Sequence, residues 1–142
     1  MEIYIKSKVK PTENKNKVRR AILNIFPHAK LVFKDNYWEG TCRDVETLKQ
    51  RLRKQAILDT ARAILEENVK GDTVTFYLNK QAAYVKAINF DIDTHGGIFV
   101  KIKDEEIMKV IKDIAPRTKG GVIIEEEELE QEEQEETQKE EQ

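Results

Sequence analysis

Apolar and polar residues alternate along several short stretches of the chain. At its start, Ile3 and Ile5 point one way while Tyr4 and Lys6 point the other. This period of two residues is typical of a strand that buries one face. The pattern predicts a first strand with a basic outer face, and Pro11 ends it.

The same alternation predicts further strands. Residues 29–34 and 37–41 flank the turn pair Asp35-Asn36, which favours a β-hairpin. The segment 80–86 is too polar at one end for a buried strand and is predicted to be a short helix or a connection. Other strands are predicted at 73–79, 87–90 and 98–103, the last two on either side of a turn-rich segment at 93–97.

Two segments carry apolar residues at helical spacing. In the first, Thr12 or Asn14 is placed to cap a helix that Pro27 ends. In the second, Asp104 is the expected cap and Pro116 closes the helix. Their apolar stripes are Val18, Ala21, Ile22, Ile25 and Phe26 in the first, and Ile107, Val110, Ile111 and Ile114 in the second.

The segment 48–65 is also helical in spacing, but its apolar stripe changes face near Gln55. Two interpretations fit: one long helix buried on both sides, or two helices that meet at a bend around Lys54-Gln55. A straight helix would need a core on both sides, which a small domain does not provide. We therefore favour the bend, with Asp44 as the N-cap of the whole unit.

These elements predict a single α+β domain. The helices are separated by hairpins of antiparallel character, which favours a mostly antiparallel sheet with helices packed on one face. Trp38 is expected in the core or against the following helix.

Charge divides the chain into two regions. Residues 1–120 contain 24 Lys and Arg against 16 Asp and Glu, a net charge of +8, whereas residues 121–142 contain 11 Glu and one Lys, a net charge of −10. Only the body has enough apolar residues to form a core. We expect a folded domain over residues 1–116 and a linker with a disordered acidic tail over residues 117–142.

The sequence contains none of the usual catalytic arrangements. Cys42 is the only cysteine, so disulfides within the chain and zinc sites with paired thiolates are excluded. His28 and His95 lie far apart with no ligand spacing around them, and Gly96-Gly97 lacks the spacing and the lysine of a phosphate loop. We predict a protein that is not an enzyme and needs no cofactor or metal. No apolar run approaches membrane-spanning length, and we expect a cytoplasmic location.

Three strings carry a resemblance: 53–62 (RKQAILDTAR), 76–83 (FYLNKQAA) and 9–13 (VKPTE). They resemble an archaeal family of uncharacterised proteins described as RNA-binding, whose fold is similar to that of the large-subunit ribosomal protein that binds 5S rRNA. The resemblance covers residues 1–116 and implies that fold and RNA as the partner. The chain departs from the family at His95-Gly96-Gly97, where a Gly-Pro pair is expected, and in the tail from Glu125 onward.

The basic body favours contact with RNA phosphates, and amide side chains can read irregular RNA. We expect structured RNA, such as ribosomal or transfer RNA, to bind the basic surface around the helical bend and the segment 79–81. The candidate residues are Arg19, Arg20, Lys49, Arg51, Arg53, Lys54, Gln55, Arg62, Asn79, Lys80 and Gln81.

A second hypothesis belongs to another class: an adaptor or structural module that forms a homodimer or docks a protein, with the charge serving solubility. Nuclease treatment separates the two hypotheses. A partner bridged by RNA is lost from a pull-down, whereas a partner bound to protein stays.

The acidic tail has two possible roles. If it visits the basic body, deletion of residues 122–142 raises affinity for RNA at low salt, because the tail no longer competes. If it only solubilises, the deletion leaves that affinity unchanged. Titration of transfer RNA into the full-length and the truncated chain at low salt decides between the roles.

Overall fold

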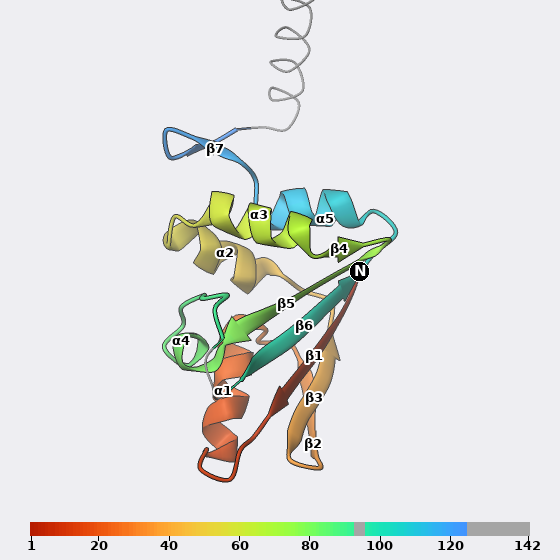
Figure 1. Cartoon of the computed structure of the whole chain (residues 1–142), viewed down its shortest axis with the longest axis vertical. Helices are drawn as coiled ribbons and strands as arrows, with labels where there is room; N and C mark the ends of the chain where they lie inside the picture. Colours follow the sequence, from red (N-terminus) through yellow and green to blue (C-terminus); the bar gives the residue numbers. More distant parts are fainter. Residues whose placement is uncertain (93–95, 125–142) are drawn as a thin grey trace, which may run out of the picture.

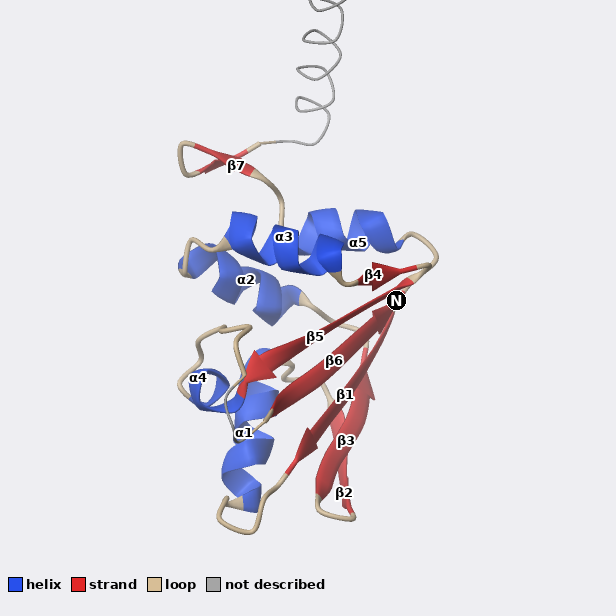
Figure 2. Cartoon of the chain, viewed as in Figure 1, coloured by secondary structure: helices blue, strands red, loops and turns tan. Residues whose placement is uncertain are grey.

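A six-stranded antiparallel sheet forms the body of the protein (Figures 1 and 2). The computed structural model describes residues 1–92 and 96–124. The strands lie in the order β2-β3-β1-β6-β5-β4, so the N-terminal strand pairs with β3 on one side and with β6 on the other. Their bounds are β1 Glu2–Lys8, β2 Lys30–Lys34, β3 Tyr37–Cys42, β4 Val69–Lys70, β5 Thr73–Asn79 and β6 Gly97–Lys103.

The helices lie on one face of this sheet, as predicted (Figure 2). In Figure 1, α1 and α4 lie together near one end of the sheet, and α2, α3 and α5 lie near the other. The helix bounds are α1 Lys15–Ile25, α2 Glu46–Lys54, α3 Leu58–Glu67, α4 Lys80–Tyr84 and α5 Ile107–Ile114.

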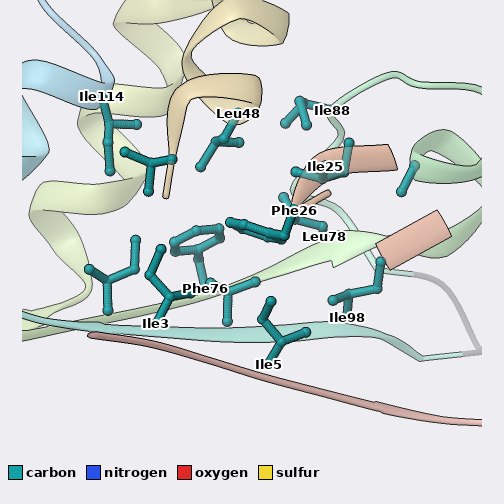
Figure 3. Close-up of a cluster of buried hydrophobic side chains, with 14 of the residues drawn as sticks. Ile3, Ile5, Ile25, Phe26, Leu48, Phe76, Leu78, Ile88, Ile98 and Ile114 are labelled. Carbon is teal, nitrogen blue, oxygen red and sulfur yellow. The ribbon is translucent and has the colours of Figure 1, made fainter. Parts of the chain in front are cut away.

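The core fills the space between the sheet and the helices. Every second residue of the central strands is buried, including Ile3 and Ile5 of β1, because a pleated strand turns alternate side chains to the same side. Figure 3 shows strand residues Phe76 and Ile98 and helix residues such as Leu48 around this space. Trp38 is buried as expected, and its indole Nε1 donates to the carbonyl of Lys15 at 2.9 Å. The alternate residues of the strands form the opposite, uncovered face.

The bend in the central helical unit is confirmed. Helix α2 ends at Lys54 and α3 begins at Leu58, with Ala56 between them in the left-handed region at φ +56°. Helix α2 buries Leu48 and Leu52 on one side of the unit. The chain must turn here because the apolar stripe changes face, so a straight helix would leave half of its apolar residues in water.

The predicted hairpin is formed by β2 and β3. Asp35 and Asn36 both have positive φ, at 53° and 66°, as the tight turn between twisted antiparallel strands requires. Gly40 faces the backbone of β2 so closely that an added Cβ would lie 2.1 Å from the carbonyl oxygen of Lys30. A side chain at residue 40 would push the edge strand away from the sheet.

The predicted capping residues accept backbone hydrogen bonds, but two of the three helices begin later than predicted. Asn14 caps α1, accepting hydrogen bonds from the backbone N–H groups of Asn16 and Lys17. Asp44 and Asp104 each accept from the backbone N–H two residues further on, but α2 and α5 begin one or two residues later than the predicted caps imply.

The prediction of a strand at 87–90 is wrong. This segment is a loop that pairs with no described strand, because its backbone groups bond to single partners and not to a ladder. Its backbone bonds elsewhere: the carbonyl of Asn89 accepts from the N–H of Asn79 at 2.8 Å, and Ile88 bonds to a glutamine side chain of the helical bend.

The region expected to be a linker contains a small hairpin. Strands β7 (Thr118–Lys119) and β8 (Val122–Ile123) pair around Gly120 and Gly121, which both have positive φ. Asp59 of α3 holds the hairpin, because its carboxylate accepts from the N–H and from the hydroxyl of Thr118, and these bonds lower the pKa of Asp59. The predicted domain boundary at residue 116 stays a prediction, and the predicted disordered tail from residue 125 lies outside the described residues.

Leu52 provides a test of the core. Its side chain is fully buried, and Leu52→Ala is expected to lower the free energy of unfolding by about 2–5 kcal/mol, since it leaves a cavity. Urea denaturation measures the change. Gln50→Ala, on the exposed side of the same helix, is the matched control and should stay within about 0.5 kcal/mol of the unchanged protein. A similarly small effect of Leu52→Ala would contradict the described packing.

Candidate nucleic-acid interface

Three stretches of the sequence contain no carboxylate: residues 14–34, 47–58 and 73–90. They carry six, four and two of the Lys and Arg residues. These stretches include α1, the bend between α2 and α3, and α4 with the loop that follows it. Where they come together, none of the three stretches supplies a carboxylate to neutralise their cations, which favours a positive local potential.

Hydrogen bonds join the three stretches at one corner of the molecule. From α1, the amide Nδ2 of Asn24 donates to the carbonyls of Ala83 and Tyr84, each at 3.0 Å. From α2, Arg51 donates through Nε to the carbonyl of Asn24 at 2.8 Å and through Nη1 to the carbonyl of Lys86 at 3.4 Å. Arg51 therefore connects α1 to the loop after α4.

Gln55 makes the third connection. Its Nε2 donates to the carbonyl of Ile88 at 3.0 Å, and its Oε1 accepts from the N–H of Ile88 at 2.6 Å. The side-chain amide thus satisfies both backbone groups of Ile88 in the way a neighbouring strand would. Because both of its polar atoms are engaged, the role predicted for Gln55 as a reader of RNA bases finds no support in this geometry.

We define the basic corner as Arg20, Arg51, Lys54, Gln55 and Lys86. Lys54 and Lys86 are exposed and make no ion pair within the described residues. Arg20 is also exposed, and it lies between Lys17 and Asn24 on the side of α1 that faces α4, since residues three and four apart share a helix face. Of the predicted residues, Arg51 and Gln55 contact the neighbouring stretches directly. Arg20 lies one helical turn before Asn24, and Lys54 is next to Gln55 in the chain.

Two predicted residues of α2 point instead toward α5. Lys49 forms ion pairs with Asp113 at 2.9 Å and with Glu46 at 3.3 Å. Partial burial by itself lowers the pKa of Lys49, but the hydrogen bonds and charges of Asp113 and Glu46 outweigh it and the net shift is upward. Arg53 donates to the carbonyls of Asp113 and Ile114, at the C-terminal end of α5.

Two other predicted residues are buried. Arg62 is 4% exposed, and it donates to Glu66 at 2.6 Å and to the carbonyl of Ala115 at 3.1 Å. Lys80 is 7% exposed, and its ammonium group lies 2.9 Å from Glu13. Both charges are matched inside the protein, as buried charges must be. Neither side chain presents a surface to a phosphate, so the expectation that they contact RNA is corrected.

The remaining predicted residues lie around the corner's edge or away from it. Asn79 caps α4 by accepting from the N–H of Ala82, and its Nδ2 donates to the carbonyl of Asp91. Gln81 is exposed on α4. Arg19 is on another side of α1 from Asn24, with its guanidinium 6.0 Å from the centre of the Trp38 ring.

Sequence reasoning missed Lys86. Lys86 has positive φ, at 65°, in the turn that ends α4, and it comes near Arg51 only through the folded chain. One sequence signal could have found it: the stretch 73–90, like the other two, has no carboxylate.

The described structure adds two negative findings. Residues 1–92 and 96–124 hold no group of three or more His, Cys, Asp or Glu side chains that could bind a metal ion. In the same part of the chain, no helix is both long and apolar enough to cross a membrane. The expectation that the protein is not an enzyme stays a prediction.

Comparison with known proteins identifies the family. A family model described as RNA binding matches residues 2–104. A UPF0201 protein from Methanocaldococcus jannaschii is 66% identical over 137 residues, which cover 91% of this chain and 81% of the relative. The chain belongs to the UPF0201 family. Another member, from Pyrococcus abyssi, is 39% identical over 87% of this chain and 96% of its own length. The expected archaeal RNA-binding family is thereby confirmed.

Solved structures of UPF0201 proteins have the same fold. A crystal structure of the protein from Methanococcus jannaschii superposes with a TM-score of 0.84 at 65% identity, covering 88% of this chain and all of that chain. A protein from Archaeoglobus fulgidus, with 22% identity, gives a TM-score of 0.61 over 78% of this chain and 92% of its own and shows likeness of fold alone. The expected similarity to the ribosomal protein that binds 5S rRNA stays a prediction.

Gln55 provides a test of the corner. Gln55→Ala removes both partners of the Ile88 backbone, and a hydrogen bond is worth roughly 1 kcal/mol. We therefore expect the Ile88 amide to exchange its hydrogen about fivefold faster or more, as measured by NMR. Gln81→Ala is the matched control, because the Gln81 side chain makes no hydrogen bond within the described residues. Unchanged exchange at Ile88 would show that Gln55 does not hold this loop.

Proposed function

We propose that this UPF0201 protein binds structured RNA through the basic corner. The observation that carries the proposal is the meeting of three carboxylate-free stretches at a site where Arg20, Lys54 and Lys86 are exposed. A surface of this kind attracts the phosphate backbone and releases its counterions. The description of the matching family as RNA binding supports the same function.

Arg51 gives the corner a defined geometry. Two of its N–H groups are occupied by the carbonyls of Asn24 and Lys86. The third nitrogen, Nη2, makes no hydrogen bond within the described part of the chain. A guanidinium held in this way is already oriented for a phosphate oxygen, so less conformational entropy is lost when RNA binds.

The chemistry favours recognition of RNA shape over sequence. The groups that remain available are cations, whereas the amides of Gln55 and Asn79 are engaged within the protein. Cationic groups bind phosphates and fix orientation but do not distinguish bases. We therefore propose a folded RNA such as a transfer or ribosomal RNA as the partner, recognised by the arrangement of its backbone.

Removal of the exposed lysines tests the proposal. The double variant Lys54→Gln and Lys86→Gln is expected to keep its fold and to bind transfer RNA more weakly. Each lost phosphate contact lowers the magnitude of the log–log salt slope by about 0.7–0.9. Fluorescence anisotropy at several salt concentrations measures both the affinity and the slope.

The matched control removes the same charge elsewhere. Lys109 and Lys112 belong to α5, away from the corner, and the variant Lys109→Gln with Lys112→Gln should retain the affinity and the slope. Equal losses in both double variants would mean that overall charge, and not this corner, attracts RNA. A flat salt dependence of the unchanged protein would contradict phosphate contact altogether.

The adaptor or homodimer hypothesis stays a prediction. It requires that a partner survive nuclease treatment in a pull-down, or that the protein sediment as a dimer without RNA.

A further inference from the structure

The face of the sheet opposite the helices is uncovered by other described elements. Strand register aligns its outward side chains in rows across the sheet: Lys6 pairs with Phe99, which pairs with Tyr77, and in the next row Tyr4 pairs with Lys101. These residues alternate with the buried core positions. We call this surface the outer sheet face.

Aromatic rings lie side by side on the three central strands of this face. The ring centres of Tyr77 and Phe99 are 5.4 Å apart, and those of Tyr4 and Phe99 are 6.4 Å apart. Tyr77 is 46% exposed. Tyr4 and Phe99 are partly exposed, because no described helix covers this side of the sheet. A cluster of aromatic rings that stays accessible to water is a candidate contact surface.

Cations surround these rings. The outer sheet face carries seven lysines and two carboxylates, and none of the seven forms an ion pair within the described residues. Beside the aromatic rings lies a hollow of about 1050 Å³, whose lining includes Tyr4, Phe99, Lys101 and Lys103. The seven lysines are Lys6, Lys8, Lys30, Lys34, Lys70, Lys101 and Lys103.

One of the two carboxylates is held by an aromatic hydroxyl. The Tyr4 hydroxyl donates to Glu39 Oε1 at 2.5 Å. Desolvation, followed by this hydrogen bond and the charge of Glu39, raises the pKa of Tyr4 to about 12. The hydrogen bond thus joins Tyr4 to the neighbouring strand β3 and occupies one oxygen of the Glu39 carboxylate.

We infer that the outer sheet face is a second RNA site, which takes a single-stranded segment by stacking its bases on Tyr77, Phe99 and Tyr4 while lysines such as Lys101 and Lys103 contact its phosphates. Alternation of aromatic faces with cations is the combination that binds single strands without sequence preference. This inference rests on the proposed function and extends it, because the basic corner takes folded RNA and the outer sheet face takes its unpaired bases.

Charge argues against a second copy of the chain as the occupant. In a two-fold dimer the same patch faces itself. Here that arrangement would oppose seven lysines to seven lysines with only two carboxylates on each side to compensate. A polyanion with flat apolar bases complements both features of the surface, the charge and the rings.

The test uses the full chain and a single-stranded RNA of about ten nucleotides, within the usual site size, that carries 2-aminopurine at its centre. Stacking of the probe base on a ring quenches its fluorescence. In the double variant Tyr77→Leu and Phe99→Leu, the apolar bulk remains and the ring faces are lost. We expect affinity for this probe to fall by about 5- to 100-fold and the quenching to disappear, with the salt slope unchanged.

Two controls separate stacking from other causes. Val32→Ala, which removes exposed apolar surface from the same face at the edge strand β2, should leave the affinity unchanged. Lys101→Gln with Lys103→Gln should lower the magnitude of the salt slope by about 0.7 for each lysine, as single strands require. Thermal unfolding establishes that each variant is folded.

Three results would overturn the inference. The Tyr77→Leu and Phe99→Leu variant could bind and quench the probe as the unchanged protein does. The unchanged protein could sediment as a dimer that this variant converts to a monomer, which would make the face a contact between copies. The unchanged protein could also bind transfer RNA but not the single strand. That result would contradict the second site and would leave the proposed function supported. Failure to bind any RNA would instead overturn the proposed function itself.

Discussion

Burial of only one face of the sheet is the constraint on which the rest of the structure depends. The central strands place apolar residues such as Ile5, Val100 and Phe76 on the helix side, where they are excluded from water. The helices must therefore all pack on that side, and their own polar faces turn outward. The protein is left with two surfaces of different chemistry: a layer of helix faces, and a bare pleated surface where aromatic and lysine side chains stand in rows.

Within the helix layer, the arginines of the central unit contribute to structure as well as to charge. The last carbonyls of a helix have no partner inside that helix. Arg53 and Arg62 donate to such carbonyls at the end of α5, and Arg51 donates to the carbonyl of Asn24 near the end of α1. The planar guanidinium suits this role because it offers several donors in fixed directions. The lysines of the corner, Lys54 and Lys86, have no such task and remain exposed.

The break between α2 and α3 connects these observations. It turns the apolar stripe of α3 back toward the core, and it places Gln55 opposite the loop after α4, where the side-chain amide replaces a missing strand. The loop in turn brings Lys86 beside Arg51. The position of the helical bend thus decides where the basic corner forms. The corner carries positive charge because the three stretches that meet there contain no carboxylate.

The sequence by itself determined the local elements. Periodicity was sufficient for β1, the β2–β3 hairpin, β5, β6 and the bend at Gln55, because each depends on residues close together in the chain. It failed at 87–90, where an apolar run resembles a strand but its backbone bonds to Asn79 at the end of β5 and to the distant side chain of Gln55. The two-residue strands β4, β7 and β8 are too short to produce a periodic signal.

Only the tertiary structure decided which cations are available to a partner. Lys80 and Glu13 are 67 residues apart, so no local pattern could show that they form a buried pair. Likewise, the alternation of β1, β5 and β6 predicts outward side chains, but the strand order and register decide that Tyr4, Phe99 and Tyr77 lie next to one another. The physical reason is that helix and strand periods are set by neighbouring residues, whereas burial of a charge and adjacency on a sheet depend on contacts between distant parts of the chain.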